Sequence, residues 1–238
     1  MTGCVAIIPA RAGSKRIPGK NTRDFCGQPL ISYSIVAAKN SGLFDQIIVS
    51  TDCEKVAAVA RRYGAETPFV RPAKLADDHC GIGEVIDHAI DALIGLDQKP
   101  DYVCCIFATA PLLRPDDLER GLREIECDTR FSSSLAVTTF DFPVQRALRV
   151  DQSMGLSMIS PEYQMTRSQD LEETYHDAGQ FFWIRLSNRH DPNAGQKAIL
   201  IERMRVQDID TPEDWDMAEC QFRAVHMYEA SQERESSS

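Results

Sequence analysis

Residues 8–21, Ile-Pro-Ala-Arg-Ala-Gly-Ser-Lys-Arg-Ile-Pro-Gly-Lys-Asn, are rich in groups that bind phosphate. Arg11, Lys15, Arg16 and Lys20 fall within ten residues of a chain whose net charge is −10. A glycine-containing loop that leaves a buried strand also exposes backbone N–H groups to anions. The spacing matches neither G-x-x-x-x-G-K-[ST] nor G-x-G-x-x-G. Charge spacing alone fits a polyphosphate site and a solvated basic loop equally well, and the position after a strand favours the site.

Two aspartates near the other end of the chain could bind a hard cation. Asp208 and Asp210 flank Ile209 in the segment 205–212. Side chains alternate in an extended chain, so both carboxylates point to the same side. Mg²⁺ prefers one or two carboxylates completed by water and substrate phosphates, which suits a nucleoside triphosphate. An isolated Asp-x-Asp is weak evidence, and taken alone it is better explained as acids that favour the positive end of the following helix.

Polar and aromatic residues gather in the segments 165–171 and 175–183. The first contributes Arg167 and Gln169, and the second contributes His176, Asp177 and several aromatic rings. A guanidinium and several amides suit a hydroxylated sugar that carries a carboxylate, although a hydrophilic loop is the alternative. Neighbouring residues of a strand face opposite ways, so we expect His176 and Asp177 not to form a catalytic dyad.

Short apolar runs predict the strands that position these residues. The runs are Val5–Ile8, Gln46–Ser50, Tyr102–Phe107 and Leu135–Thr139. They are β-branched and nearly continuous, which is typical of strands buried on both faces of a parallel sheet. Amphipathic helices are predicted between them, at Pro29–Ala38, Glu54–Tyr63 and Gly83–Ile94. The alternation predicts an α/β fold with a doubly wound, mostly parallel sheet, whose ligands bind at the carboxyl ends of the strands.

The alternation lapses between about residues 140 and 180, which predicts a small inserted subdomain within one domain of residues 1–230. Strands resume at Phe181–Ile184 and Ala198–Ile201. Thr211 is the predicted N-cap of a last helix that starts at Pro212 and runs to about Ala230. The polar segment Ser231–Ser238 is predicted to be a disordered tail.

Composition excludes several classes of protein. The 238 residues include 26 Lys and Arg against 36 Asp and Glu, which argues against a protein that coats nucleic acid or an anionic membrane. The 8 cysteines are scattered without C-x-x-C spacing, so we expect reduced thiols in the cytoplasm. The chain shows neither a leader nor a run of about 18 apolar residues, and we expect a soluble protein that is not exported.

Three motifs resemble those of the cytidylyltransferases that activate 2-keto acid sugars such as sialic acid. The segment 8–21 resembles the family's I-P-A-R-x-G-S-K opening, the segment 71–78 resembles its R-P-x-x-L-A-x-D stretch, and the segment 208–211 resembles its D-I-D-T metal motif. The resemblance covers nearly the whole chain. It implies a Rossmann-like nucleotidyltransferase fold whose inserted subdomain binds sugar and mediates a homodimer.

Two segments resemble the branch of the family that acts on pseudaminic acid. They are Ala108-Thr109-Ala110-Pro111 and 175–181, Tyr-His-Asp-Ala-Gly-Gln-Phe. Where the sialic-acid branch has a glutamine that touches the sugar, this chain has Phe107. A phenyl ring cannot hydrogen-bond a hydroxyl, but it suits the terminal methyl group of a 9-deoxy sugar.

The resemblance implies a reaction of CTP with a nine-carbon 2-keto acid sugar, which yields the CMP-sugar and pyrophosphate. Arg11, Lys15 and Lys20 would be catalytic by neutralising the leaving group, and Asp208 and Asp210 would hold Mg²⁺. The implied nucleotide site consists of Ala10, Arg11, Gly13, Ser14, Lys15, Lys20, Asn21 and Arg71, with Asn21 and Arg71 on cytidine. The implied sugar site consists of Phe107, Thr109, Arg167, Gln169, Tyr175, His176, Asp177 and Gln180, with Arg167 as the anchor.

Other functions remain open from the sequence. Within the family, the substrate could instead be N-acetylneuraminic or legionaminic acid. Outside it, a glycosyltransferase that consumes a nucleotide sugar also pairs a nucleotide domain with an Asp-x-Asp metal site. Binding a nucleotide sugar requires fewer cations than binding a triphosphate, so the basic loop speaks against this alternative. A sensor that binds CTP without turnover would leave the sugar-site residues without a purpose.

Overall fold

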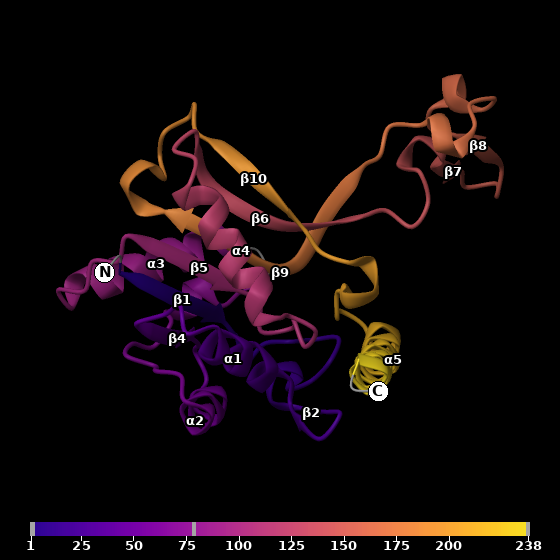
Figure 1. Ribbon diagram of the computed structural model, residues 1–238. Coiled ribbons are helices and arrows are strands. Elements are labelled where there is room, and N and C mark those ends of the chain that lie inside the picture. Colours follow the sequence, from indigo (N-terminus) through magenta and orange to yellow (C-terminus); the bar gives the residue numbers. More distant parts are fainter. Residues whose placement is uncertain (1–2, 78–79, 237–238) are drawn as a thin grey trace.

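A computed structural model describes residues 3–77 and 80–236, and its centre is a six-stranded sheet (Figure 1). The strands lie in the order β10-β6-β9-β5-β1-β4. Their bounds are β1 Cys4–Pro9, β4 Gln46–Ser50, β5 Tyr102–Ile106, β6 Phe131–Thr139, β9 Tyr175–Arg185 and β10 Gly195–Leu200. Two residue pairs form a small separate ribbon, β2 Asp24–Phe25 and β3 Gln28–Pro29.

The sheet is doubly wound and mostly parallel, as the sequence predicts. β1 pairs in parallel with β4 and β5, and Ile7 stands between Ile48 and Cys105 in the register. β10 pairs in parallel with β6, whereas β9 runs antiparallel between β5 and β6. The carboxyl ends of β1, β4 and β5 therefore meet at one edge, where ligands bind in folds of this class.

Helices cover both faces of the sheet because alternate strand residues point to opposite sides. From β1, Cys4, Ala6 and Ile8 pack with helices α1, α2 and α4, while Val5 and Ile7 pack with α3. The helices are α1 Leu30–Ser41, α2 Glu54–Tyr63, α3 Ile82–Gly95 and α4 Pro115–Glu126. Three of them fall where the apolar spacing predicts, and α4 is a helix that the sequence analysis missed.

Helix α4 packs closely on strand β9. The indole Nε1 of Trp183 donates a hydrogen bond of 3.0 Å to the carbonyl of Leu118. A Cβ atom on Gly121 would stand 2.8 Å from side-chain atoms of Phe181 and Trp183, so this contact requires glycine. The close approach holds α4 against β9.

A third apolar cluster lies beside the sheet and joins three distant segments. Ile17 comes from the basic loop, Ile209 from between the two aspartates, and Trp215 from the last helix, α5 Pro212–Ser236. Ile209 is fully buried and Ile17 is 1% exposed. Burial of these two side chains fixes the chain on either side of each, and it sets the positions of the neighbouring cations and carboxylates.

An arm of residues 140–174 stands apart from the body (Figure 1). It carries the hairpin of β7 Leu148–Val150 and β8 Leu156–Met158, and the short turns η3 Val144–Arg146, η4 Pro161–Tyr163 and η5 Ser168–Asp170. No residue from 140 to 174 is buried. The arm corresponds to the predicted insertion, although the strand that follows already begins at Tyr175.

The last helix, α5, spans Pro212–Ser236 and begins as predicted. Thr211 and Asp214 form reciprocal hydrogen bonds, with the Asp214 N–H donating to the Thr211 hydroxyl and the Thr211 N–H donating to the Asp214 carboxylate. The helix continues through residues 231–236, so the prediction of a disordered tail is wrong there, and residues 237–238 lie outside the described residues. Within the described ranges, no helix has the length and apolar character of a membrane span.

Candidate active site

The basic loop after β1 is held by bonds to the neighbouring segments. The N–H of Ala10 donates to the carbonyl of Ser50 at 2.9 Å, and the N–H of Ala12 donates to the carboxylate of Asp52 at 2.9 Å. Asn21, which is 8% exposed, donates from Nδ2 to the carbonyl of Arg11 at 3.1 Å. The loop is thus a braced structure at the carboxyl end of a strand.

A cavity of about 340 Å³, here called the loop cavity, opens inside this loop. Its lining residues are Arg11, Ser14, Lys15, Arg16, Lys20, Asn21 and Asp210. Nη2 of Arg16 lies 2.6 Å from Asp210, and Nζ of Lys20 lies 3.3 Å from the same carboxylate. Lys20 also donates to the carbonyl of Ile209 at 2.6 Å. Four cations around one space have the charge that a polyphosphate would require.

The two aspartates are close enough to influence each other. Burial, and then the charge of Asp210, raise the pKa of the Asp208 carboxyl, while Lys20 opposes the shift. Ile209 lies in the core between them, so both carboxylates point away from the same apolar cluster. Like charges held together in this way are stabilised by a bound cation.

The carboxylate pair fits a magnesium ion that a substrate completes. Carboxylate oxygens are ligands that Mg²⁺ prefers, and Mg²⁺ retains water or phosphate at its other positions. Among the described residues, no group of three or more His, Cys, Asp or Glu is placed to hold a metal without such help. Asp208 and Asp210 would therefore hold the ion together with phosphate oxygens.

A second cavity, the Arg71 cavity, adjoins the loop cavity through Arg11. Its other lining residues are Pro9, Arg71, Leu75, Asp77, Cys80, Ile82, Val85 and Phe107. Arg71 is 4% exposed and donates from Nε to the hydroxyl of Ser50 at 3.2 Å. Burial lowers the pKa of its guanidinium, and the charge of Asp52 opposes this. Apolar walls with one buried guanidinium suit a flat ring with polar edges.

A third cavity, the acidic cavity, has a volume of about 590 Å³ and adjoins the Arg71 cavity through Phe107. It is lined by Phe107, Thr109, Thr138, Phe140, Asp141, His176, Asp177, Ala178, Gly179, Arg203, Val206, Gln207 and Asp208. The N–H of Phe107 donates to the carbonyl of Gln180 at 2.9 Å, and its carbonyl accepts from Ser34 at 2.8 Å. The ring between the two cavities thus stands on a fixed backbone.

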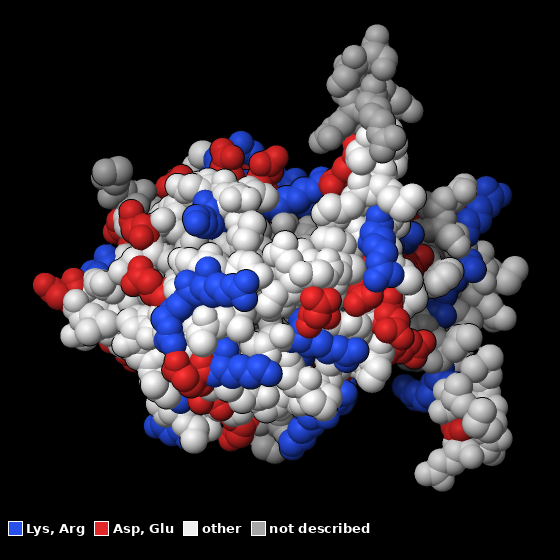
Figure 2. All heavy atoms as spheres, turned by 90° about the horizontal axis from the view of Figure 1, so that it is seen from below, with Lys and Arg blue, Asp and Glu red and all other residues white. Residues whose placement is uncertain are grey.

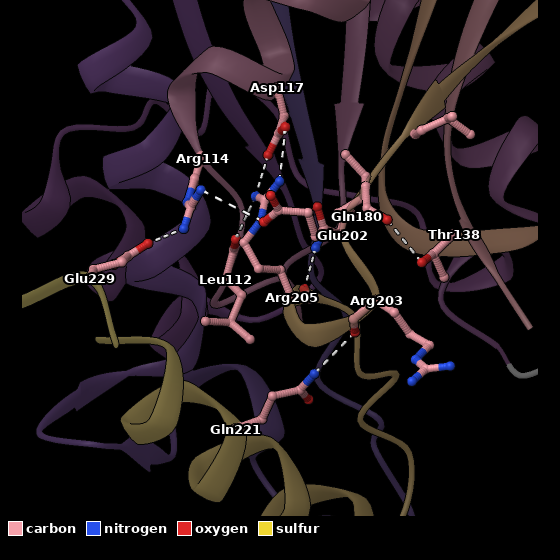
Figure 3. A network of polar contacts seen from close by, with 12 residues as sticks. Leu112, Arg114, Asp117, Thr138, Gln180, Glu202, Arg203, Arg205, Gln221 and Glu229 are labelled. Atoms are coloured by element: carbon pink, nitrogen blue, oxygen red, sulfur yellow. Dashed lines mark hydrogen bonds and ion pairs between the residues drawn. The ribbon is translucent and has the colours of Figure 1, made fainter. Parts of the chain in front are cut away.

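A polar network around the buried Arg205 fixes the turn that precedes Asp208 (Figure 3). Arg205 is 4% exposed and donates to both carboxylate oxygens of Asp117 on α4, at 2.5 and 3.2 Å. It also donates from Nε to Glu202 at 3.0 Å. Gln180 donates from Nε2 to the carbonyl of Arg205 at 2.6 Å. The segment that leads to Asp208 is therefore anchored to both α4 and β9.

Comparison with known proteins identifies the family. A family model described as cytidylyltransferase matches residues 5–184. The chain is 41% identical to a pseudaminic acid cytidylyltransferase of Campylobacter jejuni, over 93% of this chain and 97% of the relative. The chain belongs to the cytidylyltransferase family. It is also 34% identical to a CMP-N,N'-diacetyllegionaminic acid synthase of Legionella pneumophila, over 90% of this chain and 94% of the relative.

Solved structures of other cytidylyltransferases share the fold. A CMP:2-keto-3-deoxy-manno-octonic acid synthetase complexed with CTP has a TM-score of 0.68 at 18% identity, covering 94% of this chain and 100% of the other. A 4-diphosphocytidyl-2C-methyl-D-erythritol synthase from Anaerococcus prevotii has a TM-score of 0.63 at 14% identity, covering 93% and 99%. These structures show the Rossmann-like fold. The family model and the 41% identical relative show the nucleotidyltransferase class, so the glycosyltransferase hypothesis is wrong.

The structure of this cytidylyltransferase brings many of the predicted site residues together. The predicted cations and Ser14 line the loop cavity, and Arg71 lines the adjoining one. Phe107, Thr109, His176 and Asp177 line the acidic cavity. His176 and Asp177 both line it although they are neighbours in β9, where they pair in register with Thr138 and Val137, and the bulge of β9 follows them. They form no dyad, since Nδ1 of His176 contacts the carbonyl rather than the carboxylate of Asp177.

Four predicted sugar-site residues do not line the acidic cavity of their own chain. Gln180 is 3% exposed and supports the backbone of Arg205, so its side chain does not face a substrate. Tyr175 is exposed and donates its hydroxyl to Glu173. Arg167 is exposed on the arm, and Gln169 lies in a neighbouring cavity beside Glu172 and Glu173. The prediction that these four side chains share one pocket with Phe107 is wrong within a single chain.

One predicted nucleotide-site residue, Ala10, needs correction. Ala10 is 1% exposed and its N–H is bound to Ser50, so its side chain and N–H belong to the fold. Gly13 is exposed, and a Cβ atom there would meet nothing within 4 Å. Asn21 braces the loop and lines the loop cavity, whereas Arg71 lines the adjoining cavity. The roles of Gly13 in the nucleotide site and of Asn21 and Arg71 on cytidine stay predictions. Asp78 of the predicted Arg-Pro motif lies outside the described residues.

Several residues of the site were missed from the sequence. The acidic cavity includes Phe140, Asp141 and Arg203, none of which belongs to a recognised motif. Arg205 and Asp117 were missed as well, although each is a buried charge whose partner lies 88 residues away in the chain. Pairing over such a separation leaves no local pattern in the sequence.

Proposed function

We propose that the protein transfers CMP from CTP to the anomeric hydroxyl of pseudaminic acid and releases pyrophosphate. The observation that carries the proposal is a series of three cavities in which each neighbouring pair shares a lining residue. The loop cavity shares Arg11 with the Arg71 cavity, which in turn shares Phe107 with the acidic cavity. This arrangement offers adjoining spaces for a triphosphate, a pyrimidine and a sugar. The named Campylobacter relative supports the choice of sugar.

The loop cations would carry out the electrostatic part of the reaction. Negative charge accumulates on the leaving pyrophosphate as the bond to the α-phosphorus breaks. Arg11, Lys15 and Lys20 line the cavity in which that group would lie. Because Asn21 and Asp52 brace the loop in advance, little rearrangement is needed when the charge develops.

The proposed reaction also requires a magnesium ion. Asp208 lines the acidic cavity and Asp210 lines the loop cavity, so together they would hold the ion between the two. When bound, the ion polarises the phosphoryl group and lowers the pKa of the sugar hydroxyl. The two aspartates would also orient the hydroxyl toward the phosphorus, which a pair fixed by the buried Ile209 can do.

We propose a homodimer formed through the arm. Phe142, Met154 and Met165 are 82, 80 and 91% exposed, and Leu148, Val150, Leu156 and Ile159 are more than half exposed. Water contact with so many large apolar side chains is unfavourable, and a second copy would bury them. In the dimer, Arg167 could reach the acidic cavity of the other copy. Sedimentation of the wild type and of Met165→Asp tests this, and a monomeric wild type would overturn it.

The CTP substrate and the state of the cysteines bear on where in the cell the protein acts. We propose a cytoplasmic location, where CTP and reduced thiols are both found, and all eight cysteines are free.

We also propose that nucleic acid is not a partner. On the face drawn in Figure 2, basic and acidic side chains are interspersed rather than gathered in a basic field.

The test of the proposed function is product analysis. Purified protein is mixed with CTP, magnesium chloride and pseudaminic acid, and the products are identified by mass spectrometry and ³¹P NMR. We expect equal amounts of CMP-sugar and pyrophosphate, with formation of both prevented by EDTA. Binding of CTP without either product would overturn the proposal in favour of a sensor.

A further inference from the structure

The acidic cavity has a charge balance that does not suit an acidic sugar. Three carboxylates line it, those of Asp141, Asp177 and Asp208. Among its described lining residues, Arg203 is the single lysine or arginine. A sugar acid that enters this space meets like charges, so its carboxylate requires a cation within the cavity.

The side chain of Arg203 lines that cavity because of its position in a short turn. Arg203 and Arg205 both belong to the turn η7, Arg203–Arg205, which precedes the two aspartates. Arg205 points inward to Asp117, whereas the side chain of Arg203 leads away from the buried network (Figure 3). The carbonyl of Arg203 accepts from the N–H of Val206 at 3.1 Å and from Gln221 at 3.3 Å. Its backbone is therefore held while its guanidinium remains accessible.

The guanidinium already binds a carboxylate in this structure. Nε of Arg203 lies 2.9 Å from Oδ1 of Asp141, and the two side chains are 55 and 67% exposed. Exposed ion pairs contribute little to stability, so this contact exchanges readily for another carboxylate. Asp141 lies at the start of the arm and also lines the acidic cavity, so it occupies the place that a substrate carboxylate would take.

We propose that Arg203 binds the carboxylate of the sugar acid and that the sugar displaces Asp141 in doing so. The inference rests on the proposed function and names a residue that determines substrate affinity. A guanidinium pairs with a carboxylate through two parallel hydrogen bonds, which fixes orientation as well as position. Arg203 thus replaces Arg167 as the anchor supplied by the same chain.

The two members of the ion pair have opposite expected effects. Arg203→Met removes the anchor, and we expect the KM for pseudaminic acid to rise about tenfold or more. Asp141→Asn removes the internal competitor and one repulsive charge, and we expect the same KM to fall about twofold to fivefold. The KM for CTP should change less than about twofold in both variants, because the loop cavity is untouched.

Steady-state release of pyrophosphate measures both constants for the wild type and each variant. Arg61→Met is the matched control, since Arg61 is an exposed arginine paired with Glu54 on α2. Arg203→Lys keeps the charge but loses the paired hydrogen bonds, and we expect an intermediate KM for the sugar acid. Thermal melts establish that each variant folds, and Asp141→Asn tests the inference independently of Arg203→Met.

An unchanged KM for the sugar acid in Arg203→Met overturns the inference, provided that the wild type is active. So does a KM that rises in Arg167→Met but not in Arg203→Met, because the anchor then comes from the arm of a second copy. A wild type that uses no sugar acid overturns the proposed function itself, which distinguishes the two failures.

Discussion

Nη2 of Arg16 lies 2.6 Å from Oδ2 of Asp210, although the two residues are 194 positions apart in the chain. The contact joins the basic loop to the segment that holds Asp208 and Asp210. Ile17, next to Arg16, and Ile209, next to Asp210, are buried in one apolar cluster. The backbone beside Arg16 and beside Asp210 is therefore held in place before a substrate arrives. A triphosphate that binds here would meet its counter-charges in place, which lowers the cost of reorganisation.

Arg11→Ala should reduce kcat by about a hundredfold, by analogy with the loss of one preorganised donor to a developing charge. Arg11 lines both the loop cavity and the Arg71 cavity, so its removal leaves negative charge on the leaving group less compensated. Initial rates at saturating CTP measure the effect. Arg61→Ala, on the exposed side of α2, is the control, and a kcat within a factor of about three of wild type would contradict the role.

Asp208→Asn should raise the magnesium requirement steeply and also stabilise the fold. Burial and Asp210 raise the pKa of Asp208 in the folded state, so ionising it costs folding free energy. The cost is absent below the unfolded pKa of about 4 and develops as pH rises through the folded pKa. Because Asp208 is exposed and water screens its charge, we expect Tm at neutral pH to rise by no more than about 1 °C.

The stabilisation by Asp208→Asn should disappear when melts are repeated below about pH 4. Asp210→Asn is the matched control, because Asp210 is paired with Arg16 and Lys20 and its neutralisation removes both ion pairs. That variant should share the magnesium defect without the gain in Tm. Unchanged magnesium titrations in both variants would place the ion elsewhere.

Phe107→Gln should shift substrate preference toward sugars that end in a hydroxyl. The ring of Phe107 stands between two cavities, with its centroid 6.3 Å from that of Phe182. An amide in its place can hydrogen-bond a hydroxyl, and it offers less to a methyl group. We expect the ratio of kcat/KM for pseudaminic over N-acetylneuraminic acid to fall about tenfold. Phe107→Leu should preserve the ratio, and an unchanged ratio in Phe107→Gln would remove Phe107 from the specificity determinants.

Arg205→Met should cost about 3–5 kcal/mol of stability, because it leaves the buried carboxylate of Asp117 without its main partner. Chemical denaturation measures the loss. The double variant Arg205→Met with Asp117→Leu replaces both charges with apolar groups and should recover a large part of it. If the single variant is as stable as wild type, the pair does not anchor the segment that leads to Asp208.

The sequence predicts the sheet and most helices because burial imposes periodic patterns. Continuous apolar runs such as Gln46–Ser50 correspond to the buried strands, and the spacing in Glu54–Tyr63 reproduces α2 to the residue. The missed helix α4 had a usable signal. Pro115 followed by two aspartates begins it, as Pro212 followed by two acids begins α5.

The site is only partly predictable because its contacts are long-range. The common orientation of Asp208 and Asp210 follows from the buried Ile209 between them. Gln180 is buried because β9 bulges beside it, and a strand pattern that ignores the bulge cannot show this. The Arg203–Asp141 pair joins the arm to η7 and depends on the fold as a whole.

The most direct measurement compares pyrophosphate release from CTP with pseudaminic, legionaminic, N-acetylneuraminic and 3-deoxy-octulosonic acids at matched concentration. We predict that kcat/KM for pseudaminic acid exceeds that for each other acid by at least about tenfold. A higher kcat/KM for legionaminic or N-acetylneuraminic acid would contradict the assignment of the sugar and the role of Phe107. No release with any of the four would contradict the account as a whole.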